Sequence, residues 1–174
     1  EYVAYLNSIH VDAIIMQDIG MMDKMRKEFP NMEIHASTQM HIHNEEGVKL
    51  VKELGLTRAV LARETDYQTI KKIKENVDIE LEIFVHGALC ISYSGQCLMS
   101  SLIGNRSGNR GTCAGSCRHK YDVLNENLEK INNDKYNLST KDLNSLDNLE
   151  KLIKTGADSF KIEGRMKSKS YVYL

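Results

Sequence analysis

Hydrophobic and polar residues follow two rhythms along the chain, one typical of buried strands and one typical of amphipathic helices. Short apolar runs that end in polar residues or glycine predict strands at 11–20, 32–38, 57–64, 80–87 and 157–165. Apolar residues at helical spacing follow at 21–29, 44–55, 66–77 and 146–156, and the first eight residues look like a helix already under way. We expect residues 135–146 to run from a sixth strand into a helix through Ser139 and Thr140.

Strands and helices alternate with a period of roughly 20 to 25 residues, which is the rhythm of βα units around a parallel sheet. We therefore predict a single α/β domain over residues 1–174, namely a TIM-barrel-like (β/α)8 domain that lacks its N-terminal strands. A doubly wound open sheet is the alternative, but no GxGxxG phosphate loop supports it. The chain begins with Glu1 and stops at KSYVYL without a cap, so we interpret it as a piece excised from a longer chain.

Polar residues follow every predicted strand. In a barrel, residues at the carboxyl ends of the strands face the active site. Here they are Gln17 and Asp18, Ser37 to Gln39, Arg63 and Glu64, His86, Ser139 to Lys141, and Glu163 to Arg165. Because these ends converge on one face, we expect a site there, with His86 and Glu163 as acid–base groups beside Arg165.

The charges nearly cancel, with 23 basic against 24 acidic residues. This balance excludes a polycationic surface over the whole molecule but leaves room for a local basic patch. No apolar run has the length of a membrane span, and no signal peptide opens the chain. We therefore expect a cytoplasmic protein without membrane contact, in a compartment where disulfides are uncommon.

All four cysteines lie in one glycine-rich loop, CISYSGQCLMSSLIGNRSGNRGTCAGSC, at residues 90–117. Their spacings, C-x6-C, C-x15-C and C-x3-C, differ from the C-x2-C pairs that zinc sites favour. Iron–sulfur clusters accept looser spacings because each iron of the wider cluster needs one thiolate. Cys90, Cys97, Cys113 and Cys117 are thus candidate cluster ligands, and Arg106, Arg110 and Arg118 could offset the negative charge.

Other roles for the thiols stay open. Zinc is the second candidate, and two disulfides or scattered structural cysteines are less favoured in a cytosolic chain. A catalytic thiol is also possible, with Cys90 beside His86, although that role leaves the other three cysteines without a function.

The stretch EIFVHGALCISYSGQCLMS at 82–100 resembles the signature of the collagenase-like peptidase family U32. GNRSGNRGTCAGSCRHKY at 104–121 looks like its continuation, and ASTQM, VLARE and FKIEGRMKS are similar to other segments of that family. The likeness covers nearly all of the chain. Where many members have Pro-Glu after the last segment, this chain has Lys169 and Ser170, a minor departure at the start of a helix.

The resemblance implies a TIM-barrel-like domain in which the cysteines bind a 4Fe–4S cluster. It also implies two kinds of activity. The family label is peptidase, whereas similar members hydroxylate RNA, one branch forming 5-hydroxyuridine at the tRNA wobble position from prephenate and another modifying a ribosomal cytidine. Related pairs take part in oxygen-independent ubiquinone hydroxylation.

Hydroxylation of tRNA is the activity that we favour, because the sequence lacks the GxSxG and HExxH motifs of hydrolases. Arginines suit a dicarboxylate such as prephenate or the phosphates of RNA. Tyr93 could stack on a base. The predicted substrate-binding residues are Arg63, Gln39, Arg106, Arg118 and Tyr121, to which Arg165 adds a further cation.

Two other functions remain as alternatives. A peptidase acting on protein would need a metal-bound water, and His35, His41 and His43 could bind a metal, although a solvated HIH loop is favoured over that role. The chain could also be an inactive fragment or a partner-binding module, with a homodimer formed through open sheet edges.

Overall fold

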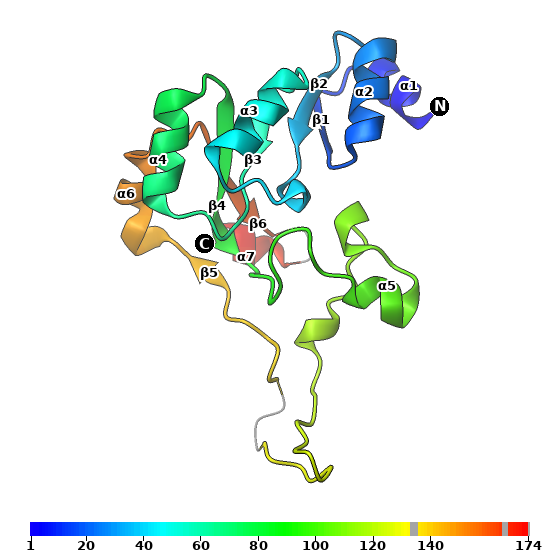
Figure 1. Ribbon diagram of the computed structural model, residues 1–174, viewed down its shortest axis with the longest axis vertical. Coiled ribbons are helices and arrows are strands. Elements are labelled where there is room, and N and C mark those ends of the chain that lie inside the picture. The colour runs from blue at the N-terminus through cyan, green and yellow to red at the C-terminus, as the bar shows by residue number, and fades with distance from the viewer. Residues whose placement is uncertain (133–135, 165–166, 174) are drawn as a thin grey trace.

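The computed structural model describes residues 1–132, 136–164 and 167–173. It is an α/β fold built on a mixed sheet of six strands (Figure 1). The strands are β1 (Ala13–Met16), β2 (Glu33–Ala36), β3 (Arg58–Val60), β4 (Glu80–Gly87), β5 (Leu143–Asn144) and β6 (Ser159–Glu163). The helices are α1 (Tyr2–Ser8), α2 (Ile19–Glu28), α3 (Glu45–Glu53), α4 (Tyr67–Asn76), α5 (Met99–Gly104), α6 (Leu149–Ile153) and α7 (Lys169–Tyr173).

The first four strands lie side by side in the order of the chain and are all parallel. β6 also runs parallel to β4, from the pair Glu82 and Ser159 to the pair Gly87 and Glu163. The sheet thus grows in one direction, without the reversal of order that a doubly wound fold requires. The predicted alternation of strands and helices is confirmed from α1 to β4 and again at β6.

One face of the sheet packs against the helices, because alternate residues of each strand point to the same side. Ile34, Ala59 and Leu81 on that face are fully buried. The helices add apolar residues at helical spacing, namely Met22 and Met25 from α2, Val48 and Val51 from α3, and Ile70 and Ile73 from α4. This layer of apolar side chains is the core of the domain.

Side-chain caps fix where the helices begin. The carboxylate of Asp18 accepts a hydrogen bond from Met21 N at 2.8 Å, and Asn44 Oδ1 accepts one from Gly47 N at 2.8 Å. Ser37 Oγ accepts from Gln39 N at 3.1 Å at the start of a short 3-10 turn, Thr38–Met40. Asp18 and Ser37, which the sequence placed among the site residues, therefore cap helices instead.

The prediction of a full strand and helix at 135–146 is wrong. In its described part, only Leu143 and Asn144 form a strand, β5, which pairs antiparallel with His86 and Gly87. Helical structure follows as a 3-10 turn, Leu146–Asn148, and α6. The reason is long-range: β4 has a register shift between Phe84 and His86, and Val85 O accepts from Ser145 N at 3.0 Å.

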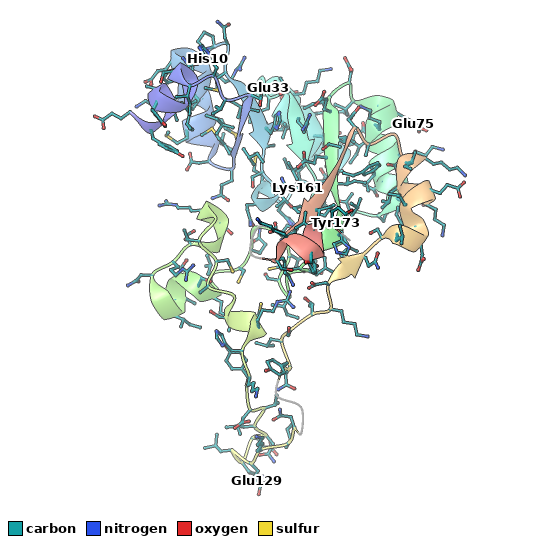
Figure 2. All side chains as sticks on the ribbon, turned by 180° about the vertical axis from the view of Figure 1, so that it is seen from behind. His10, Glu33, Glu75, Glu129, Lys161 and Tyr173 are labelled. Atoms are coloured by element: carbon teal, nitrogen blue, oxygen red, sulfur yellow. The ribbon has the colours of Figure 1, made fainter. Side chains whose placement is uncertain are left out.

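Between β4 and β5 the chain makes a long excursion from the sheet, described for residues 88–132 and 136–142 and drawn from green to yellow in Figure 1. It contains α5 and two 3-10 turns, Gly108–Arg110 and Ser116–Arg118. Figure 2 shows Glu129 at its far tip. The sheet is not closed into a barrel by the described residues, in which β1 pairs with β2 and β6 pairs with β4.

Candidate functional site

The excursion begins at the carboxyl edge of the sheet and lies against the loop that follows β2. Gly95 has φ +77°, and a Cβ atom there would lie 2.0 Å from Gln39 O. Only glycine permits this approach, since a side chain would overlap the carbonyl group. Asn109 Nδ2 donates to Gly95 O at 2.9 Å, so the structure places Gln39 beside the cysteine-bearing segment.

The loop after β3 holds the same segment at a second point. Ser94 is fully buried, and its N–H donates to Glu64 Oε1 at 2.8 Å. Arg63 N donates to Ser94 Oγ at 3.3 Å, while the Arg63 guanidinium lies 5.6 Å from the centre of the Phe84 ring. Arg63 therefore lies over an aromatic ring of β4, in a cation–π contact.

Two predicted substrate-binding arginines support the excursion itself. The Arg118 guanidinium donates to Leu89 O and Thr140 O and, at 3.0 Å, to Ser139 Oγ. Arg106 Nε donates to Thr112 O at 2.8 Å. Both guanidinium groups thus join separate stretches of main chain, and any substrate anion would have to share them.

None of the four cysteines forms a disulfide. Burial raises the pKa of the Cys117 thiol, the charge of Arg118 opposes this, and Cys90 and Cys113 add to the rise. Cys90 and Cys113 are therefore both within electrostatic range of Cys117. Gly115 N donates to Cys113 Sγ at 3.3 Å, the kind of N–H···S contact that iron–sulfur sites use.

The donor set fits an iron–sulfur cluster, because it offers four unpaired thiols and a main-chain N–H directed at one sulfur. The thiols are not gathered as ligands, however: within the described residues, no group of three histidine, cysteine, aspartate or glutamate side chains is placed to hold a metal ion. Assignment of Cys90, Cys97, Cys113 and Cys117 as ligands stays a prediction.

A cluster of polar side chains surrounds His86 at the ends of β4 and β6. The His86 ring lies 5.1 Å from the ring of Tyr171, measured between centroids. The Tyr171 hydroxyl donates to Asp142 Oδ2 at 2.7 Å, and Lys167 Nζ donates to the same oxygen at 2.9 Å. Lys167 and Tyr171, together with the charge of Arg118, hold the pKa of Asp142 below its ordinary value.

Glu163 is the last residue of β6 and pairs with Gly87 at the end of β4. A Cβ atom on Gly87, where φ is +119°, would lie 2.3 Å from Glu163 O, so the two strand ends touch. His86 pairs with Ile162 and Gly87 pairs with Glu163, so the main chains of His86 and Glu163 are adjacent but their side chains point to opposite faces of the sheet. Their roles as acid–base groups stay a prediction. Arg165, the third predicted catalytic residue, lies outside the described residues.

Tyr121 and the three histidines of the β2 region have separate roles. The Tyr121 hydroxyl donates to Ser116 O at 2.8 Å, which holds the turn that carries Cys117. His35 lies on β2 and contacts Glu33 Oε1 at 2.9 Å through Nε2, while His41 and His43 follow the strand in the next loop. The three histidines therefore do not form one group.

The sheet face opposite the helices carries an ionic network that sequence reasoning missed. Glu82, buried on β4, accepts from Lys161 Nζ at 2.8 Å and from Arg58 Nη1 at 3.3 Å. Lys161, labelled in Figure 2, and these partners line an open cavity of about 610 Å³ that also contains His35 and Ile15. The sequence signal that could have revealed this network is the placement of charged residues at alternate positions of β4 and β6.

The residues around Asp142 were also missed. Lys167 and Tyr171 lie near the end of the chain, and Asp142 belongs to the segment whose strand was predicted wrongly. Their meeting depends on β5 returning to the end of β4, which no local pattern encodes. Lys167 falls within FKIEGRMKS, and this placement was the only pointer to it.

The fold and the site define an α/β domain whose sheet presents a cysteine-bearing excursion and a cluster of cations and acids at its carboxyl edge. The chain belongs to peptidase family U32, because the model of that family matches residues 1–174.

The relatives that the chain matches include proteins named for RNA modification and a protein named as a collagenase. The chain is 43% identical to the "tRNA hydroxylation protein P1" of Bacillus subtilis, over 99% of this chain and 42% of that protein. It is 43% identical to the "23S rRNA 5-hydroxycytidine C2501 synthase" of Escherichia coli, over 93% and 24%. It is also 35% identical to a "Collagenase" of Porphyromonas gingivalis, over 94% and 42%. The chain thus spans less than half the length of these relatives.

A solved structure of a U32 peptidase is similar over 50% of this chain and 36% of that chain, with a TM-score of 0.44 and 18% identity. In the described part of the chain, no helix is long and apolar enough to cross a membrane.

Proposed function

We propose that the full-length protein is an iron–sulfur-dependent RNA hydroxylase that modifies a uridine of tRNA with prephenate as co-substrate. The observation that carries this proposal is that all four cysteines of the chain lie in the one segment 90–117, where Cys90 and Cys113 are near enough to Cys117 to raise the pKa of its thiol. Relatives at 43% identity are named for hydroxylation of tRNA and of ribosomal RNA, which supports the same substrate class.

Cys90, Cys97, Cys113 and Cys117 would hold the 4Fe–4S cluster. When bound, the cluster supplies electron transfer for the hydroxylation. The protein would support it through the N–H of Gly115 at Cys113 and through the positive charge of Arg118 beside Cys117, since thiolates repel one another. Both contacts favour the deprotonated sulfur.

The substrates would bind along the carboxyl edge of the sheet. Arg63, held over Phe84, offers a guanidinium for a carboxylate or a phosphate. Arg106 and Arg118 already donate to main-chain oxygens. They would therefore attract the substrate through their positive electrostatic potential more than through new hydrogen bonds. His86 and Glu163 would move protons there, with Gln39 and Tyr121 in the surrounding walls.

The finer features of the fold belong to the same proposal. Strands that add in chain order, each parallel to its predecessor, support a TIM-barrel-like domain closed by strands beyond β1 and β6. A tRNA substrate would place the protein in the cytoplasm.

A peptidase is the second candidate, and the relative named "Collagenase" favours it. Cleavage of a peptide bond would require a nucleophile or a metal-bound water. The cluster of His86, Tyr171 and Asp142 is the arrangement of polar groups that could serve such a reaction.

The test begins with anaerobic purification of the full-length protein and measurement of its visible absorbance, iron and sulfide. We expect a brown protein with about four iron and four sulfide per chain, both lost in Cys90→Ser and Cys113→Ser. A colourless protein that holds one zinc ion, or no metal, and that cleaves denatured collagen would contradict the proposal and favour the peptidase. A protein with neither metal nor activity would indicate a partner-binding module.

A further inference from the structure

Three aromatic side chains meet where the loop after β2 touches the excursion. The His41 ring lies 4.7 Å from the His43 ring and 5.9 Å from the Tyr93 ring, between centroids. The interplanar angles are 49° and 70°. Tyr93 is 67% exposed, so much of its ring faces solvent instead of being packed in the core.

The backbone holds His41 in a conformation that a residue with a Cβ rarely adopts. Its φ is +57°, in the left-handed region, and its N–H donates to Thr38 O at 3.1 Å. His43 Nδ1 lies 2.8 Å from His41 O, and because a carbonyl oxygen only accepts, Nδ1 of His43 must carry the hydrogen. Hydrogen bonds therefore hold the main chain of His41 and the ring of His43.

The His41 ring makes no hydrogen bond through Nδ1. This atom is buried and has no partner within the described residues. No contact of Nδ1 positions the His41 ring. The neighbours of this ring are the rings of His43 and Tyr93.

The surrounding segment carries only positive charge. From residue 83 to residue 121 the sequence contains no aspartate or glutamate, whereas the chain as a whole has slightly more acidic than basic residues. Arg106, Arg110 and Lys120 of this segment are exposed. A surface of this composition attracts a polyanion, and its attraction for nucleic acid weakens as salt rises.

We propose that Tyr93, His41 and His43, the aromatic surface, stack on a nucleobase of single-stranded RNA. This inference rests on the proposed function and names a binding subsite for its substrate. The Glu64 carboxylate beside this segment is already bound by the N–H of Ser94. An exposed aromatic ring on a segment whose own charged residues are all basic is an arrangement by which proteins bind unpaired bases. Because Tyr93 lies between Cys90 and Cys97 in the chain, a base held there brings its neighbours to the carboxyl edge.

Exposed apolar residues of α5, Leu102 and Ile103, offer a different kind of surface, one that suits a protein. They lack an aromatic ring and do not explain why a tyrosine and two histidines are gathered at the β2 loop. The aromatic surface thus favours RNA, and protein binding becomes an outcome of the test.

Fluorescence anisotropy of the full-length protein measures the effect with two probes, a short fluorescein-labelled oligouridylate and an abasic oligonucleotide of the same length. The abasic probe keeps the phosphates and removes the bases. We expect Tyr93→Ala to weaken oligouridylate binding about tenfold, at the lower end of base–aromatic stacking energies, and to leave abasic binding unchanged. Tyr93→Phe should retain the affinity.

Two control variants distinguish the loss of stacking from the loss of positive charge and from the nonspecific effect of truncating an exposed side chain. Arg110→Ala should weaken both probes alike, because it acts on phosphates. Leu102→Ala should weaken neither probe. Equal loss on both probes in Tyr93→Ala, or no loss on either, would overturn the inference. Gelatin serves as the protein probe, and loss of gelatin binding in Tyr93→Ala without loss of oligouridylate binding would also overturn it.

The assay also distinguishes this inference from the function on which it rests. RNA hydroxylation that proceeds with the same KM in Tyr93→Ala would leave the proposed function standing and refute the subsite. Base-selective binding without any hydroxylation would leave the subsite standing and refute the function.

Discussion

At the scale of single residues, Glu82 shows how the sheet tolerates charge. It is buried, which alone would raise its pKa, yet the hydrogen bonds from Lys161 and Ser159 and the charge of Arg58 hold the pKa below the ordinary value of 4.5. Opposite charges and well-directed donors therefore outweigh desolvation at this site. The arrangement links β3, β4 and β6 on the face away from the helices.

Replacement of Glu82 by glutamine should lower the free energy of unfolding by about 2 kcal/mol at neutral pH, because Lys161 and Arg58 lose their shared partner. A lowered carboxyl pKa stabilises the fold above the ordinary value, and this stability is lost as the pH falls through the lower folded-state pKa. The difference between wild type and Glu82→Gln should therefore shrink below about pH 4.5 in urea denaturation of the full-length protein.

The matched control is Glu80→Gln. Glu80 binds the same Arg58 at 2.6 Å, but its side chain is 49% exposed. Solvent screening should limit its effect to less than about 1 kcal/mol. Equal losses for the two variants would show that burial does not decide the energy of this network.

Individual side chains were the part of the site that sequence patterns located least well. Polar residues do follow the strands, but Asp18 and Ser37 cap helices, and Arg63 lies over Phe84. A strand end and a helix start coincide in βα units, so the same polar residue suits either role. Only the neighbours in space decide between them.

At the scale of elements, the sequence pattern predicted those strands and helices whose formation depends on interactions close in the chain. The strands and helices up to β4 follow from apolar periodicity and caps, because each βα unit buries its own face against its neighbours. β5 is two residues long and exists because the end of β4 offers a free partner at His86 and Gly87. No local sequence pattern predicts such a pairing. The contact of the excursion with the β2 loop does have a sequence signal, namely Gly95.

Gly95→Ala should separate the excursion from the β2 loop. The positive φ alone costs an alanine about 1 to 3 kcal/mol, and the Cβ would overlap Gln39 O at 2.0 Å. We expect faster limited proteolysis at residues 88–98. Gly104→Ala is the control, because a Cβ there meets nothing within 4 Å, and it should change proteolysis little. Similar cleavage of both variants would contradict the contact.

At the scale of the whole molecule, the domain is a sheet and its helices with an excursion held at a few points. These points are Gly95 at the β2 loop, Ser94 at Glu64, and Arg118 at Leu89 and Thr140. Since the described residues of the excursion include no buried apolar side chain, the order of this part depends on these contacts. The four cysteines lie on this part of the chain, so their mutual positions depend on them too.

Arg118→Lys should loosen the excursion while leaving the sheet intact. One ammonium group cannot donate to Leu89 O and Thr140 O in the geometry of a guanidinium fork. Hydrogen exchange at residues 88–92 and 139–142 should become about tenfold faster or more, with β2 and β3 unchanged. Arg110→Lys, at an exposed position of the same segment, is the control. Unchanged exchange in Arg118→Lys would mean that the arginine does not hold the excursion.

The central claim, that the cysteines of the carboxyl edge serve RNA hydroxylation, is tested most directly by nucleoside mass spectrometry. The full-length protein, purified without oxygen, is incubated with unmodified tRNA and prephenate, and the hydroxylated uridine is quantified. We predict product from the wild type and from Leu102→Ala, and none from Cys113→Ser. Equal product from Cys113→Ser and the wild type, or no product from a wild-type protein that carries its cluster, would contradict the claim.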